Sequence, residues 1–81
     1  MHSRKPLTDD EFARLVTAVR SHAPQLMDVL VRGEVLSLPL SVRNALRGAV
    51  SDEFVARGLR DDYEPNAYGL ELEHLIDRLG P

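Results

Sequence analysis

The strongest constraint on the fold is an apolar pattern between residues 40 and 59. Its apolar side chains recur at helical spacings, at Val42, Leu46, Ala49, Val50 and Phe54. This recurrence matches the 3.6-residue turn of an α-helix and not the strict alternation of a strand, so the stretch predicts a helix with one apolar face. The polar residues, Glu53 among them, are assigned to the rest of the helix surface. A helix of this kind needs partners, which the remaining segments must supply.

Two glycines of this stretch carry separate predictions. Gly58 is expected in the left-handed conformation of a Schellman ending, with Leu59 folded back onto Phe54. Gly48 is expected to mark either a close helix crossing or a break, in which case Ser51 would cap the second half.

The preceding segment predicts a helix over residues 9–22. Thr8 and Glu11 have the spacing of a capping box, in which the hydroxyl and the carboxylate each accept a hydrogen bond from a backbone N–H. The apolar stripe is Phe12, Leu15, Val16 and Val19. Residues 1–6 lack periodicity and are expected to form a flexible tail.

A second helix is predicted over residues 24–33, opened by Pro24 and ended by Gly33. The alternative is a hairpin around Arg32-Gly33, because valines favour strands, and residues 29–36 are left open between the two. The last helix is predicted over residues 66–79 from its stripe of Tyr68, Leu72, Leu75, Ile76 and Leu79. The fold class is therefore all-α: one compact domain of about four helices, approximately 9–22, 24–33, 39–58 and 66–79.

The amino-acid composition limits the classes of protein to which this chain can belong. The chain has 81 residues, 43% of them apolar and 28% charged, and no cysteine, which suits a small globule without disulfides or thiolate sites. No signal-peptide pattern and no apolar run of membrane-spanning length occurs, so we expect a soluble, cytoplasmic protein without membrane contact. Residues 52–81 hold eight acidic residues against three basic ones, and this half favours basic partners over phosphate backbones.

Catalytic motifs are not evident. The serines fall where helix capping explains them, and no glycine-rich phosphate loop occurs. Glu71 and His74 have the Glu-x-x-His spacing of di-iron helical bundles, but those bundles need two such motifs and the chain has one. We therefore expect an ordinary surface pair, no cofactor, no metal and no enzyme.

Arginines offer an alternative function. Arg14, Arg43 and Arg47 could form a phosphate-contacting face of a small nucleic-acid-binding regulator. The acidic composition makes nucleic acid the less favoured partner. Arginines more often pair with carboxylates of neighbouring helices, here Asp52, Glu53, Asp61 and Asp62.

The run Asn66-Ala-Tyr-Gly-Leu-Glu-Leu-Glu-His-Leu75 resembles a motif of small all-helical immunity proteins from bacterial toxin systems, which reads Gly-Glu-Tyr-Gly-Leu-Ala-Leu-Glu before an apolar helix. Five residues match it: Tyr68, Gly69, Leu70, Leu72 and Glu73. Asn66, Ala67 and Glu71 depart from it. The resemblance implies a cytoplasmic bacterial inhibitor that binds a toxin without catalysis.

These observations predict a non-catalytic protein-binding module, an immunity-type inhibitor or another small bacterial interaction protein. It would act by occlusion, and its partner would be another protein such as a basic toxin. Acidic, tyrosine and leucine side chains of the C-terminal half are the candidate site: Asp61, Asp62, Tyr63, Glu64, Tyr68, Leu70, Glu71 and Glu73. A homo-oligomeric structural subunit, such as a homodimer, is a further alternative.

Overall fold

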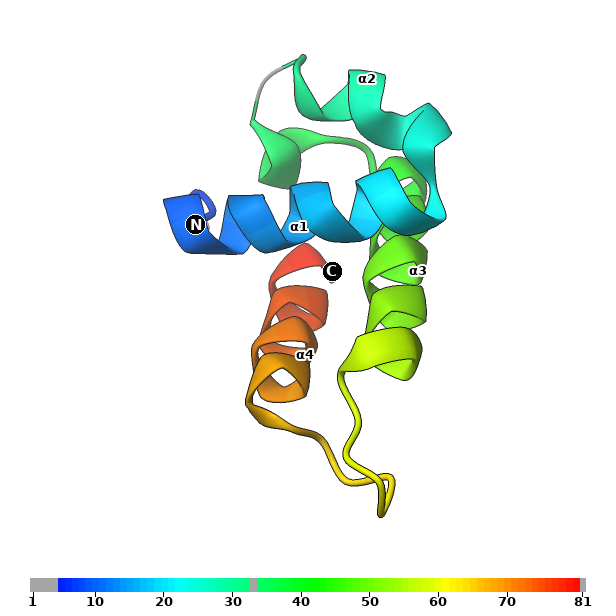
Figure 1. Ribbon diagram of the computed structural model, residues 1–81. Helices are drawn as coiled ribbons and strands as arrows, with labels where there is room; N and C mark the ends of the chain where they lie inside the picture. The colour runs from blue at the N-terminus through cyan, green and yellow to red at the C-terminus, as the bar shows by residue number, and fades with distance from the viewer. Residues whose placement is uncertain (1–4, 33, 81) are drawn as a thin grey trace.

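A computed structural model describes residues 5–32 and 34–80 and confirms the all-α bundle. Its α-helices are α1 (Asp9–His22), α2 (Met27–Leu30), α3 (Leu40–Arg57) and α4 (Ala67–Leu79). Two 3₁₀ turns, Pro24–Leu26 and Val35–Ser37, flank α2. Helices α3 and α4 run antiparallel, and α1 crosses one end of that pair with α2 beyond it (Figure 1).

The start of α1 forms as its capping box predicts. The Thr8 hydroxyl accepts a hydrogen bond from the Glu11 N–H at 3.1 Å, and the Glu11 carboxylate accepts one from the Thr8 N–H at 2.9 Å. Of the predicted tail at residues 1–6, residues 1–4 lie outside the described part of the chain. The carbonyls of Lys5 and Pro6 accept hydrogen bonds from Arg78.

The second helix is shorter than predicted. It begins as a 3₁₀ turn at Pro24 and ends at Leu30, while the predicted terminator Gly33 lies outside the described residues. The chain must turn early because both Leu30 and Val35 are buried in the one core. The hairpin alternative is wrong, since residues 35–37 form a 3₁₀ turn, and the β pairing in the described ranges is an isolated bridge between Leu59 and Pro65.

Helix α3 is continuous, and both glycine predictions within it are wrong. Gly48 is exposed with open space where a side chain would lie, so it marks neither a crossing nor a break. Gly58 has φ −93°, outside the left-handed region. The absence of side chains on Gly58 and Gly69 instead permits a close contact between the end of α3 and the start of α4. A Cβ on Gly58 would lie 3.0 Å from the Gly69 Cα, and a Cβ on Gly69 would lie 2.0 Å from the Gly58 carbonyl oxygen.

The core lies where α1, α3 and α4 meet. Each helix contributes fully or almost fully buried apolar side chains: Leu15, Ala18 and Val19 from α1; Leu46, Ala49 and Val50 from α3; Leu72, Leu75 and Leu79 from α4. Phe54 and Tyr68 pack against this cluster while half-buried. Across residues 5–32 and 34–80, no helix combines the length and the apolar character needed to cross a bilayer.

Candidate functional site

A tight hairpin joins α3 to α4 and projects beyond the ends of both helices (Figure 1). Its two arms pair through one isolated antiparallel β-bridge, between Leu59 and Pro65. The Arg60 N–H donates to the Glu64 carbonyl at 2.7 Å, and the Tyr63 N–H donates to the Arg60 carbonyl at 2.9 Å. This pattern is that of a three-residue hairpin loop, a type I turn followed by one left-handed residue. The connection between α3 and α4 is therefore a defined structure, which we call the tip hairpin (residues 60–64).

Tyr63 occupies the left-handed position of the tip hairpin. Its φ is 67°, the one positive φ of a non-glycine residue among those described. Glycine usually takes this position, because a β-carbon there approaches the backbone too closely, and asparagine is the usual alternative because its short polar side chain can hydrogen-bond to the local backbone. The tyrosine side chain is 82% exposed, so little packing within the chain offsets that strain. The sequence gives no sign of this conformation.

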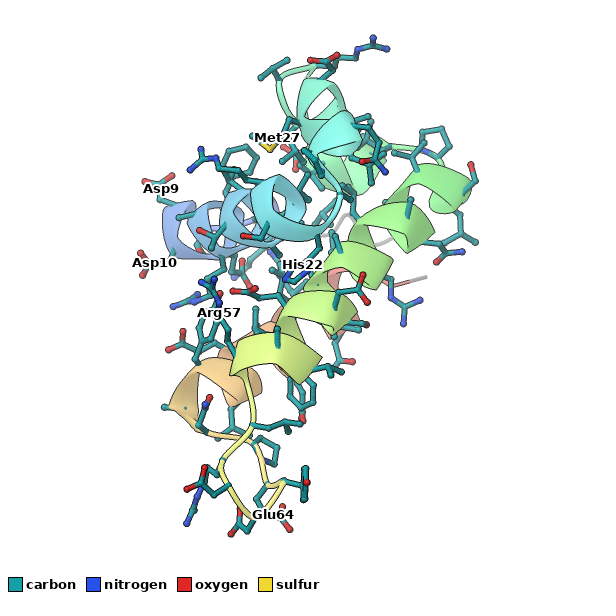
Figure 2. All side chains as sticks on the ribbon, turned by 45° about the vertical axis from the view of Figure 1, so that its right-hand side comes forward. Asp9, Asp10, His22, Met27, Arg57 and Glu64 are labelled. Atoms are coloured by element: carbon teal, nitrogen blue, oxygen red, sulfur yellow. The ribbon has the colours of Figure 1, made fainter. Side chains whose placement is uncertain are left out.

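Three carboxylates surround Tyr63 on the tip hairpin, and all are exposed. Asp62 accepts a hydrogen bond from the Glu64 N–H at 3.1 Å and lies 3.8 Å from the Arg60 guanidinium. Asp61 and Glu64 have no ion-pair partner within residues 5–32 and 34–80. Glu64 marks the far end of the molecule in Figure 2. The structure thus brings four of the predicted site residues together: Asp61, Asp62, Tyr63 and Glu64.

The base of the tip hairpin is fixed by Asn66, the N-cap of α4. Its side-chain oxygen accepts a hydrogen bond from the Gly69 N–H at 2.7 Å, while its side-chain nitrogen donates to the Arg57 carbonyl at 3.0 Å. The Asn66 backbone N–H donates to the Gly58 carbonyl at 2.9 Å. Together with the Gly58–Gly69 contact, these bonds hold the hairpin to both helices.

Tyr68 belongs to a different environment from Tyr63. Its hydroxyl donates to one oxygen of the Glu53 carboxylate at 2.7 Å, and His22 lies 2.8 Å from the other oxygen. The cluster of Glu53, His22 and Tyr68, here called the carboxylate cluster, joins α3, α1 and α4. Figure 2 shows His22 near the middle of the molecule, between α1 and α3. Burial and the hydrogen bond to Glu53 raise the pKa of Tyr68 to about 12.

Glu53 is the residue that sequence reasoning misplaced. It is 0% exposed, whereas the pattern assigned it to the polar surface. Burial raises the pKa of its carboxyl group, but the hydrogen bonds from Tyr68 and His22, together with electrostatic attraction to Arg57 and His22, outweigh burial and leave that pKa below the usual 4.5. A signal was present in the spacing, because Glu53 follows Leu46 by seven residues and Val50 by three, on the buried side of α3.

The remaining predicted site residues are spread along α4. Leu70 and Glu73 are exposed, and Leu70 keeps 59% of its surface accessible. Glu71 forms an ion pair with Arg14 of α1. Glu71 is therefore already paired within the bundle, and Tyr68 within the carboxylate cluster.

The Glu71 and His74 side chains do not converge on a common point for a metal ion. Glu71 faces Arg14, and the His74 Nε2 lies 3.3 Å from Glu11. Within the described ranges, no group of three potential metal ligands comes together.

The arginines of the alternative site have partners in the structure. Arg43 donates hydrogen bonds to the carbonyls of Leu38, Leu79 and Gly80, tying the start of α3 to the end of α4. Arg47 donates to the Asn44 side chain at 3.3 Å, and Arg14 pairs with Glu71. The predicted carboxylate partners Asp52, Glu53, Asp61 and Asp62 are not the ones used by these three arginines.

Comparisons of the chain with protein families, with curated proteins and with solved structures gave no match.

Proposed function

We propose that this chain is a non-catalytic protein-binding module that presents the tip hairpin to a basic partner protein. The observation that carries the proposal is Tyr63, an exposed aromatic side chain held in a left-handed backbone conformation. An L-residue in that conformation costs about 1–2 kcal/mol, and such strain concentrates at functional sites. A tyrosine in place of glycine supports a role for the side chain outside the folded chain.

The geometry of the tip hairpin favours binding. Backbone hydrogen bonds on both sides of Tyr63 and the fixed base at Asn66 order the loop before a partner arrives. Less conformational entropy is then lost on association. Tyrosine also suits a central anchor, because it buries a large area while keeping one polar end.

The charge of the tip hairpin indicates the kind of partner. Asp61, Asp62 and Glu64 outnumber the one arginine of the hairpin, Arg60. A surface with this charge attracts a basic surface and speeds its encounter with the chain. Occlusion of a basic site by the hairpin is the mechanism that these features support, and the resemblance of residues 66–75 to immunity proteins suggests the same class of inhibitor.

The test begins with capture of partners on immobilised wild-type protein, followed by binding kinetics with the purified partner. Replacing Tyr63 with glycine removes the anchor and relieves the backbone strain, so the fold is retained. Tyr63→Gly should speed dissociation and weaken binding by about 2 kcal/mol, or about thirtyfold. The double change Asp61→Lys and Asp62→Lys should slow association about tenfold at low salt and reduce its salt dependence.

Val55→Ser is the matched control for both variants. Val55 is an apolar side chain of α3 that is 71% exposed and lies outside the tip hairpin. Binding unaffected by Tyr63→Gly, or reduced equally by Val55→Ser, would contradict the proposal. Recovery of nucleic acid without a protein partner would favour the regulator with Arg14, Arg43 and Arg47, and recovery of the same chain alone would favour a homo-oligomer.

A further inference from the structure

A second surface lies at the other end of the molecule from the tip hairpin. The start of α1 and the turn after α2 enclose an open groove of about 330 Å³. We refer to it as the α1–α2 groove, and its apolar lining is Pro6, Leu7, Phe12, Leu30, Val31 and Val35. Leu30 and Val35 are almost fully buried in the core beneath it, whereas Val31 is 83% exposed. The groove therefore combines a fixed floor with one apolar side chain left in solvent.

Carboxylates are the charged groups of this groove. Asp9 and Glu34 both line it and are exposed, and neither has an ion-pair partner within the described part of the chain. No lysine or arginine is among its described lining residues. Figure 2 shows Asp9 far from Glu64, so the charge of the groove is distinct from that of the tip hairpin.

We propose that the α1–α2 groove binds a short basic segment of a partner protein, in which one large apolar side chain is flanked by lysine or arginine. The apolar side chain would cover Val31 and the half-buried Leu7 and Phe12, removing apolar surface from water. The flanking cations would face Asp9 and Glu34, and an acidic segment or a phosphate group would be repelled there. This inference goes beyond the proposed function, because a chain with two separate surfaces can bind two protein segments at once.

The probe is a short synthetic peptide with one leucine between pairs of lysines, blocked at both ends. It is titrated into the full-length protein while backbone amide chemical shifts are followed. We expect saturable shifts at Phe12, Leu30, Val31 and Val35, and none at the tip hairpin. Two comparison peptides separate the contributions: serine in place of the leucine tests the apolar contact, and glutamate in place of the lysines tests the charges. Both should lose binding.

Variants of the protein complete the test. Val31→Ser should weaken binding of the leucine peptide about tenfold, since it removes apolar contact from a residue that is already exposed. Val55→Ser, at a similarly exposed valine of α3, should leave binding unchanged. The pair Asp9→Asn and Glu34→Gln should weaken binding about fivefold at low salt. That difference should shrink at about 1 M salt, where charges are screened over about 3 Å.

Several outcomes would overturn the proposal. One is the absence of saturable shifts at the groove, and another is equal binding by the leucine and serine peptides. Groove shifts that depend on protein concentration without peptide would identify a second copy as the occupant. Peptide binding that requires deletion of residues 1–4 would identify the chain's own N-terminal segment as the occupant.

Discussion

The two tyrosines of this protein stand in opposite settings, although each has a carboxylate close to it. Tyr68 donates its hydroxyl to Glu53, a carboxylate with no exposed surface that also contacts His22. Tyr63 stands among exposed acidic residues at the end of the tip hairpin, in a strained conformation. The carboxylate cluster links three helices, whereas the tip hairpin is held by local hydrogen bonds of its backbone, of Asp62 and of Asn66 at its base, and contributes no side chain to the core.

This difference shows that acidic content alone does not locate a binding surface. The acidic half contains both a carboxylate buried against the core and carboxylates that remain exposed to solvent. What separates them is burial: Glu53 is removed from water and needs a partner for each carboxylate oxygen, whereas the carboxylates of the tip hairpin remain in water. Glu53 has two partners at hydrogen-bond distance, and for that reason its burial is tolerated.

The largest expected effect tests the structural side of this comparison. Glu53→Ala should lower the free energy of unfolding by about 3–5 kcal/mol, because it leaves His22 and the Tyr68 hydroxyl without their partner. Denaturant unfolding measures this change. Asp52→Ala, at the exposed neighbouring position, should change stability by less than about 0.5 kcal/mol. Similar values for the two variants would show that the carboxylate cluster is not a structural element.

Tyr68→Phe should have the next largest effect and lower the free energy of unfolding by about 1.5–3 kcal/mol, the usual contribution of a hydrogen bond to a charged group. Tyr63→Phe is its control and should be close to neutral, since the Tyr63 ring is exposed. The raised pKa of Tyr68 adds a second readout. Because the folded state favours the neutral phenol, stability should fall between pH 10 and about 12 in the wild type. That decline in stability should be weaker in Tyr68→Phe. An unchanged decline would be evidence against the assignment of a raised pKa to Tyr68.

Low pH should destabilise the protein through the carboxylate cluster. The folded pKa of Glu53 is depressed, so its stabilising contribution is present above pH 4.5 and is lost as the pH falls through the lower, folded value. The pKa of Glu11 is also lowered. Burial raises it, but the hydrogen bonds from Thr8 and Arg78 and the charges of Arg78 and His74 outweigh burial. Thermal unfolding below pH 5 should therefore show a steeper loss of stability in the wild type than in Glu53→Gln, which retains only the Glu11 contribution. Parallel pH profiles would contradict this account.

The smallest effect belongs to the tip hairpin and has the opposite sign. Tyr63→Gly should raise the free energy of unfolding by about 0.5–1 kcal/mol, because glycine adopts positive φ without strain. Tyr63→Ala keeps the β-carbon and should give no such gain. A loss of stability in Tyr63→Gly would mean that the ring supports the fold, and the contrast between the two tyrosines would fail.

The helices could be predicted because their causes are local. The capping box at Thr8 and the apolar stripes of α1, α3 and α4 depend on neighbours within a few residues. The buried carboxylate could not be predicted with the same ease, because its partners His22 and Tyr68 come from other helices. Gly58 was misread for a similar reason, since the need for glycine arises from contact with Gly69 and not from the end of α3 alone.

The candidate site was predicted in part. The acidic stretch and its tyrosine were identifiable from composition and order, and the structure places Asp61, Asp62, Tyr63 and Glu64 on one exposed hairpin. The positive φ of Tyr63 has no counterpart in the sequence, because it results from the hydrogen bonds that close the hairpin. The α1–α2 groove was not foreseen, since it depends on how the short helix α2 returns over the start of α1.

Gly58 and Gly69 contact each other at the base of the tip hairpin, so the packing of α3 against α4 ends before the chain reaches Arg60. Every residue from Arg60 to Glu64 is exposed and lies beyond the contact between the two glycines. Selection can therefore alter this segment in sequence, and even in length, with little penalty to the core. Under the proposed function, this arrangement separates the evolution of specificity from that of the scaffold: a related chain could acquire a new partner by replacing a single short turn.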